Sequence, residues 1–167
     1  MADVPMGAHS RVTLRPAQPE DASAIAEIWY LGWRDGHLGS VPSELIAARP
    51  EASFHTRAAR RTDDTVVAVV DGRVCGFVMV VADEIEQLYV SASHRGQGVA
   101  DLLIAGGERA IKDGGHPRAW LAVVAGNTRA RRFYERRGWS NEGPFDYAAA
   151  GEQGTIAVPC LRYVKKL

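Results

Sequence analysis

The 167-residue sequence has few cysteines, no net charge and no long apolar run. Its two cysteines, Cys75 and Cys160, stand far apart without Cys-x-x-Cys spacing, which argues against a disulfide framework or a zinc site and favours buried, reduced thiols. Twenty basic and twenty acidic side chains cancel, unlike the basic domains that bind nucleic acid or anionic membranes. No segment approaches the roughly 20 apolar residues of a membrane span, and residues 1–11 lack the apolar core of a signal peptide. We therefore expect a cytoplasmic protein without a nucleic-acid or membrane partner.

What is present is ordinary globular composition. Hydrophobic residues make up 46% of the chain and charged residues 24%, so a packed core is expected. No repeat, low-complexity tract or linker divides the sequence. We expect a flexible N-terminal tail over residues 1–10 and a single domain over residues 11–167.

The spacing of apolar residues predicts alternating strands and helices. Asp71-Gly72, between two β-rich runs, favours a hairpin with a type I′ turn. Together the elements predict an α/β protein with a mixed sheet and helices packed on its faces. Strands are expected at residues 12–15, 65–70, 74–81, 83–90, 119–124, 140–147 and 155–165. Helices are expected at residues 19–35, 42–49, 52–61, 99–113 and 127–137.

The strand over residues 83–90 breaks its own alternation. Ile85 falls on an odd position, whereas Leu88 and Val90 fall on even ones. A strand that keeps one face in the core changes parity only by inserting a residue. The sequence therefore predicts a β-bulge over residues 86–88.

A glycine-rich turn, Arg95-Gly96-Gln97-Gly98-Val99-Ala100, separates this strand from the next helix. Glycines let backbone N–H groups converge on an anion at a helix N-terminus, although glycine before a helix is also common for steric reasons. A dinucleotide-binding GxGxxG motif would need glycine where Asp101 stands, and the Gly-Lys-Ser/Thr of a Walker loop is absent. The turn is thus a candidate phosphate site of another kind.

Three segments taken together resemble the GNAT superfamily of N-acetyltransferases. They are residues 85–90, the glycine-rich turn, and Asn127 followed by Phe-Tyr-Glu-Arg-Arg-Gly-Trp at residues 133–139. The turn fits the family pattern Arg/Gln-x-x-Gly-x-Gly/Ala as Arg95, Gly98 and Ala100. The resemblance covers the chain from Val12 onward. It is closest to the small-amine and phosphinothricin-type acetyltransferases.

The resemblance implies a GNAT fold, in which a mostly antiparallel sheet of six to seven strands splays between the fourth and fifth and is flanked by about four helices. It also implies acetyl-CoA as co-substrate, no metal, and direct attack by the amine of a small molecule in a ternary complex. The pantetheine arm would pair with the bulged strand and the pyrophosphate with the glycine-rich turn. The cofactor-binding residues implied in this way are Leu88, Tyr89, Val90, Arg95, Gly96, Gln97, Gly98, Val99, Ala100, Asn127, Arg129 and Arg132.

Two glutamates are equal candidates for the general base, which the high pKa of an alkyl amine requires. Glu84 aligns with the glutamate base of histone-acetylating members, and Glu86 lies two residues nearer the thioester. The alternative is that both face solvent. Tyr134 resembles the family's tyrosine that protonates the leaving thiolate, although its helical spacing also suits a core residue. The arginines of the same helix, Arg129 and Arg132 among them, suit either the 3′-phosphate of CoA or a solvated basic face.

The acceptor side is less well specified. Trp29, Trp33 and His37 lie where the family shapes the acceptor pocket, but aromatic residues at helical spacing also fit a core. Residues 95–137 hold nine basic and four acidic side chains, and residues 1–94 hold eight and thirteen. This distribution suits a phosphorylated cofactor on one side and a cationic amine on the other. A protein Nα- or lysine-acetyltransferase and a non-catalytic acyl-CoA sensor remain alternative functions. The family resemblance also makes a homodimer the candidate assembly.

Overall fold

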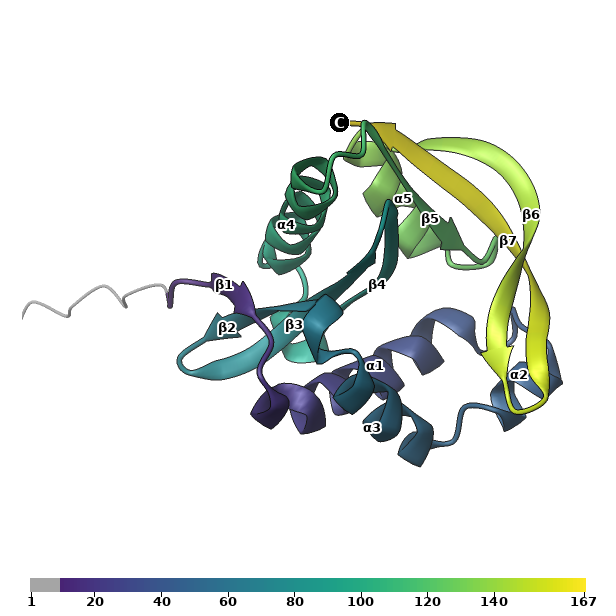
Figure 1. The fold of residues 1–167 in the computed structure, drawn as a ribbon, viewed down its shortest axis with the longest axis horizontal. Helices are drawn as coiled ribbons and strands as arrows, with labels where there is room; N and C mark the ends of the chain where they lie inside the picture. Colours follow the sequence, from purple (N-terminus) through teal and green to yellow (C-terminus); the bar gives the residue numbers. More distant parts are fainter. Residues whose placement is uncertain (1–9) are drawn as a thin grey trace, which may run out of the picture.

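A computed structural model describes residues 10–167 of the chain, so most of the expected tail over residues 1–10 lies outside it. Seven strands form one sheet in the order β1-β2-β3-β4-β5-β7-β6 (Figure 1). Every neighbouring pair is antiparallel except β4 with β5, which is parallel. The expected α/β fold with a mixed, mostly antiparallel sheet is confirmed.

The strands are β1 (Thr13–Pro16), β2 (Thr65–Val70), β3 (Arg73–Val81), β4 (Glu84–Val90), β5 (Arg118–Val123), β6 (Ser140–Gly151) and β7 (Gly154–Lys166). The α-helices are α1 (Ala22–His37), α2 (Ser43–Ala47), α3 (Glu51–Arg60), α4 (Val99–Asp113) and α5 (Thr128–Arg136). Short 3-10 turns occur at Pro19–Asp21, Thr62–Asp64 and Ala92–His94.

The local signals in the sequence act as expected at the β2–β3 hairpin. Asp71 and Gly72 have φ angles of 49° and 75°, the two positive values that a type I′ turn requires. The last hairpin is longer than predicted, because β6 continues through Ala148–Ala150 to Gly151. Alanine has low intrinsic strand preference, so this extension depends on its pairing with Thr155–Ala157 of β7.

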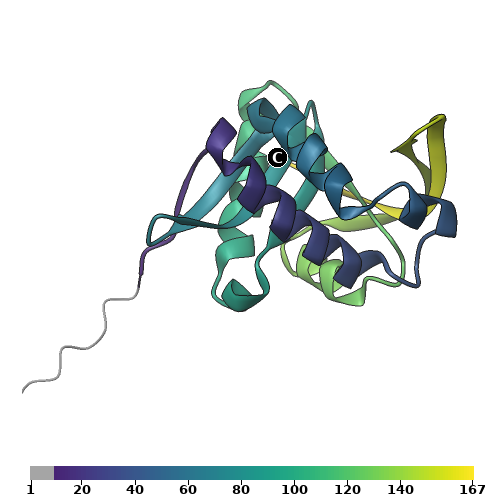
Figure 2. The same ribbon diagram turned by 90° about the horizontal axis from the view of Figure 1, so that it is seen from below.

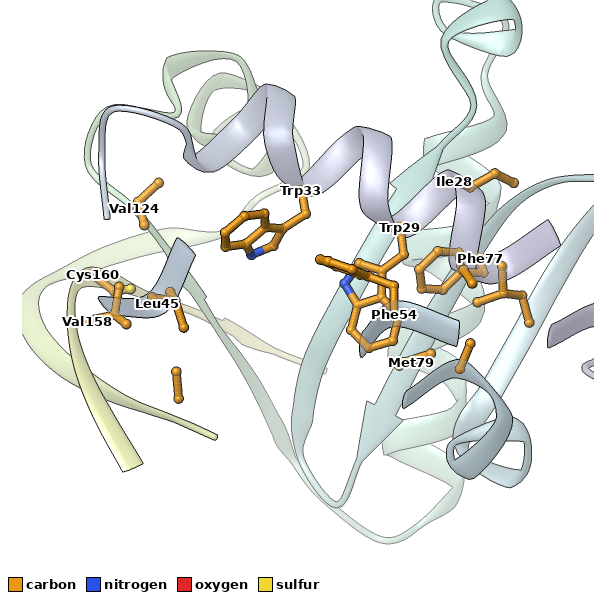
Figure 3. Close-up of a cluster of buried hydrophobic side chains, with 14 of the residues drawn as sticks. Ile28, Trp29, Trp33, Leu45, Phe54, Phe77, Met79, Val124, Val158 and Cys160 are labelled. Atoms are coloured by element: carbon orange, nitrogen blue, oxygen red, sulfur yellow. The ribbon is translucent and has the colours of Figure 1, made fainter. Parts of the chain in front are cut away.

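Helices cover both faces of the sheet. On one face α1 and α3 lie side by side (Figure 2), and they bury Trp29 and Phe54 against Phe77 of β3 (Figure 3). On the other face α4 and α5 pack Leu103 and Tyr134 into a second core cluster. The sheet is therefore held between two apolar layers, and β3 and β4 contribute side chains to both.

The bulge expected in β4 is present at Glu86. Met79 of β3 pairs with Gln87 and the next residue, Val80, pairs with Ile85, so Glu86 has no partner in the ladder. As a result Ile85, Leu88 and Val90 all pack in the cluster on the α4 side in spite of their different parity. Tyr89 lies on the opposite side, packed on the cluster beneath α1.

Strands β4 and β5 are paired at one position only, near the start of each strand. Glu84 and Trp120 form the single pair between them, supported by a 3.0 Å hydrogen bond from the backbone N–H of Trp120 to the Asp83 carbonyl. Beyond this point the two strands diverge, and the opening between them faces α1 (Figure 1). The expected splay between the fourth and fifth strands is therefore present.

Both cysteines are free and buried, as expected. Burial raises the pKa of both thiols, that of Cys160 to about 11, which keeps them protonated and unreactive. No helix within residues 10–167 is long and apolar enough to cross a membrane.

Gly32 allows α1 to lie directly on the ring of Tyr89, because a Cβ atom at this position would overlap Cδ1 of that ring. Alanine normally stabilises an exposed helix relative to glycine. We expect Gly32→Ala instead to lower the free energy of unfolding by about 1–3 kcal/mol through overpacking. Urea denaturation measures the change, with Glu27→Ala on the exposed face of the same helix as control. A more stable Gly32→Ala protein would contradict this packing.

Candidate active site

Two cavities meet in the opening between β4 and β5. The first, about 340 Å³, is bounded by β4, β5, α1, α3 and the β6–β7 hairpin. The second, about 380 Å³, is bounded by the glycine-rich turn, the start of α4 and one side of α5. Five residues line both cavities: Leu88, Tyr89, Asn127, Ala130 and Tyr134. A molecule bound in one cavity can therefore reach a molecule bound in the other at this junction.

The glycine-rich turn presents unused backbone donors to the second cavity. Gly96 and Gly98 have φ angles of 74° and 81°, which favour glycine, and Gly98 begins α4 without a side-chain cap. Within residues 10–167, the backbone N–H groups from Gly96 to Asp101 donate no hydrogen bond outside helices. Free N–H groups at the start of a helix bind anions, because the helix dipole also favours negative charge there.

Some of the arginines expected at the second cavity line it and others do not. Arg95 lines it and is held by a 3.1 Å ion pair with Asp35 at the end of α1. Arg129 of α5 also lines it. The structure does not bring Gln97 or Arg132 to either lining, since both side chains are exposed outside the cavities.

Asn127 and Tyr134 lie at the junction. The Asn127 side chain caps α5 by accepting a 3.2 Å hydrogen bond from the backbone N–H of Ala130, as its position before the helix predicts. The Tyr134 hydroxyl has no hydrogen-bond partner among the described residues, although the residue is only 8% exposed. Burial raises the pKa of Tyr134, so its hydroxyl stays protonated at neutral pH.

The two candidate glutamates differ sharply in their surroundings. Glu84 lines the first cavity, is half-buried, and accepts a 2.8 Å hydrogen bond from the Tyr147 hydroxyl. Burial raises the pKa of Glu84 to about 6, with the negative charges of Glu86 and Asp83 adding to the effect and the Tyr147 hydrogen bond opposing it. A carboxyl group with this pKa can both accept and release a proton near neutral pH.

Glu86 also lines the first cavity, but both of its carboxylate oxygens are hydrogen-bonded. Both of its oxygens accept hydrogen bonds of 2.7 Å from the Arg61 guanidinium. Such a two-point pair with a guanidinium occupies both carboxylate oxygens. The bulge places Glu86 against α3, and the pairing fixes it there.

The three residues expected on the acceptor side separate in the structure. Trp33 and His37 line the first cavity, with their rings stacked at 5.1 Å and His37 Nδ1 2.9 Å from the Trp33 carbonyl oxygen. Trp29 does not reach it. It is fully buried between Phe54 and Phe77, because it lies one helical turn closer to the centre of the sheet than Trp33 (Figure 3).

Several cavity residues were not anticipated from the sequence. Arg49, Arg57 and Arg61 line the first cavity beside Glu84, and Tyr147 enters it from β6. A sequence signal exists for two of them. Arg57 in α3 and Arg61, which caps the C-terminus of this helix, follow Phe54 at i+3 and i+7, so they continue its apolar stripe instead of its solvent face. Charged residues on such a stripe face the protein interior.

The described part of the chain contains no group of three or more His, Cys, Asp or Glu side chains placed to hold a metal ion. The first cavity instead combines one carboxyl group near its titration range with arginines and a tyrosine. The second offers backbone N–H groups and arginines. The arrangement suits the transfer of a chemical group between a small titratable molecule in the first cavity and a phosphorylated molecule in the second.

Comparison with known proteins agrees with this geometry. The family model of the acetyltransferase (GNAT) family matches residues 22–139. N-acetyltransferases of Mycobacterium bovis and Mycobacterium tuberculosis, themselves uncharacterised, are 33% identical over 114 residues, which covers 62% of this chain and 73% of theirs.

Solved structures share the fold over nearly the whole chain. A GCN5-related N-acetyltransferase of Rhodopseudomonas palustris superposes with a TM-score of 0.72 and 25% identity, over 97% of this chain and 99% of that one. A phosphinothricin acetyltransferase of Sinorhizobium meliloti, in complex with acetyl-CoA, superposes with a TM-score of 0.67 and 19% identity, over 93% and 88%. The chain therefore belongs to the GNAT family of acetyltransferases and is an acetyl-CoA-dependent enzyme of that family.

Proposed function

We propose that the protein transfers the acetyl group of acetyl-CoA to the amine of a small molecule, with the cofactor in the second cavity and the acceptor in the first. The observation that carries this proposal is the meeting of the two cavities at Leu88, Tyr89 and Tyr134. Transfer in a ternary complex needs the two reactants in contact at one point. A first cavity of about 340 Å³ is of the size that binds small molecules.

The free N–H groups from Gly96 to Asp101 would hold the pyrophosphate of CoA. Strand β4 is unpaired with β5 beyond Glu84, so its remaining backbone groups on that edge are free to pair with the pantetheine arm. A backbone N–H near Leu88 would then polarise the thioester carbonyl. Arg129, which lines this cavity, is better placed than Arg132 to meet the 3′-phosphate.

Glu84 is the better candidate for the general base. It is a cavity carboxyl group with a pKa near 6, whereas both oxygens of Glu86 are engaged by Arg61. In the proposed reaction Glu84 takes a proton from the acceptor ammonium, directly or through water, and the neutral amine attacks the thioester. The amide bond forms, the carbon–sulfur bond breaks, and the Tyr134 hydroxyl donates a proton to the departing thiolate. The remaining extra proton on the amide nitrogen passes to the Tyr134 oxygen, and Glu84 releases its proton to solvent.

Cofactor binding and turnover test the function. We expect CoA and acetyl-CoA to raise the melting temperature of the protein, because a ligand that binds the folded state stabilises it. We also expect release of free thiol from acetyl-CoA when small amines are supplied. Tight binding without turnover on amines or peptides would indicate an acyl-CoA sensor, and turnover on peptides alone would indicate a protein acetyltransferase. Absence of CoA binding would overturn the proposal.

Glu84→Gln should lower kcat by roughly 100- to 10,000-fold, the range for loss of a general base. In the wild type, the logarithm of kcat/KM should change slope near pH 6, since below this pH Glu84 is increasingly protonated and cannot accept a proton. That change of slope should be missing in Glu84→Gln. Glu86→Gln is the comparison, and a larger loss there than at Glu84 would reverse the assignment.

Tyr134→Phe removes only a hydroxyl and keeps the buried ring. We expect kcat to fall roughly 100-fold or more, as for loss of a general acid, with little change in the KM for acetyl-CoA. Tyr30→Phe, on α1 and outside both cavities, serves as control. An unchanged kcat in Tyr134→Phe would leave this tyrosine with a packing role only.

A further inference from the structure

Arg57 is a cation in the first cavity that forms no ion pair, although the more distant negative charge of Glu86 acts on it. Its guanidinium lies 4.4 Å above the ring of Trp29 and 5.9 Å from that of Phe54. Across residues 10–167 it forms no ion pair and donates no hydrogen bond. Its neighbour Arg61, by contrast, is paired with both Asp64 and Glu86.

Arg49 adds a second positive charge without a carboxylate beside it. It is buried and lines the same cavity, and it donates to the carbonyl oxygens of Ala48 at 3.2 Å and Ala150 at 2.6 Å. Burial is the largest cause that lowers the pKa of Arg57, to about 10, and the positive charge of Arg49 is the second. Arg57 therefore remains charged at neutral pH, in a position where a partly desolvated cation is costly without an anion.

The opposite charge in the cavity belongs to Glu84. Its hydrogen-bond donor is the neutral Tyr147 hydroxyl, and no salt bridge in the described chain involves it. Once the Glu84 carboxyl is deprotonated, the cavity contains one negative group, Glu84, and two positive groups, Arg49 and Arg57, that lack salt-bridge partners. Arg49 already donates to two backbone carbonyl oxygens, which leaves Glu84 and Arg57 as the groups open to a ligand. A ligand that carries both an ammonium and a carboxylate would neutralise both.

We propose that the acceptor is an amino-acid-like molecule, whose carboxylate binds the Arg57 guanidinium while its amine lies near Glu84. This inference rests on the proposed function and adds the chemical class of the acceptor. The contact with the Trp29 ring helps to hold the guanidinium in the cavity, and its N–H groups match a carboxylate in a two-point contact. The acidic excess of residues 1–94 therefore does not describe this cavity, which receives three arginines from that half of the chain.

The test compares amines with and without a carboxylate. Glycine, β-alanine, 4-aminobutyrate and 5-aminopentanoate place the two groups at increasing separation, and their primary amides are neutral matches. We expect at least one acid to be acetylated with a kcat/KM tenfold or more above that of its amide. Arg57→Met should lower kcat/KM for that acid roughly 10- to 100-fold, the usual effect of losing a charged hydrogen bond, and leave the amide unchanged.

Two further variants separate charge from packing. Arg57→Lys should retain part of the preference for the acid, because it keeps the positive charge. Arg34→Met removes another arginine stacked on an aromatic ring, that of Tyr30 at 5.4 Å, outside both cavities, and should change neither rate. Melting temperatures of all variants identify any that fail to fold.

The outcomes distinguish this inference from the proposed function. Acetylation of the amides as efficiently as the acids, or an equal loss for both in Arg57→Met, would overturn the carboxylate site and leave the acetyltransferase standing. If no amine is acetylated, calorimetry on the CoA-saturated protein decides. Binding of an acid that Arg57→Met abolishes supports the site, and failure to bind any of the four acids overturns it.

Discussion

The separation of β4 from β5 is the constraint on which the rest of the structure depends. A sheet normally satisfies its backbone groups by continuous pairing, and here the pairing between the two strands ends after Glu84 and Trp120. The sheet tolerates this opening because each half is secured independently. β4 remains paired with β3 on one side, and β5 with β7 on the other. Both cavities form in the space that results.

The bulge at Glu86 works together with the opening. It lets β4 keep Ile85 and Leu88 in the core on the α4 side while turning Glu84 and Glu86 toward the first cavity. One inserted residue thus supplies both the packing that fixes the strand and the carboxyl groups beside it. The two carboxyl groups then have different partners. Arg61 at the end of α3 donates to Glu86, and Tyr147 of β6 donates to Glu84.

Much of this could be predicted from the sequence because the signals are local. The parity change at Ile85 and Leu88, the Asp71-Gly72 turn and the glycines before α4 each depend on residues that are neighbours in the chain. The difference between Glu84 and Glu86 could not be predicted in this way. It depends on Tyr147 and Arg61, which lie 63 and 25 positions away in sequence.

How deeply a side chain is buried could not be predicted from the sequence either. Helical spacing places Trp29 and Trp33 on the same face of α1, but only the position of the helix over the sheet makes the first a core residue and the second a cavity wall. The positions of Arg57 and Arg61 in the cavity were difficult to predict for a related reason. Their charge indicates solvent exposure when each is taken alone, and only the stripe shared with Phe54 indicates the interior.

The hydrogen bond between Tyr147 and Glu84 links the shape of the first cavity to the proton affinity of a carboxyl group inside it. Tyr147 belongs to the long β6–β7 hairpin, whose residues 148–150 also form part of the first cavity. An insertion or deletion in this hairpin would alter the volume of the first cavity and, at the same time, the proton affinity of the Glu84 carboxyl. Relatives that diverge in hairpin length would therefore differ in both properties together, even with an unchanged β4.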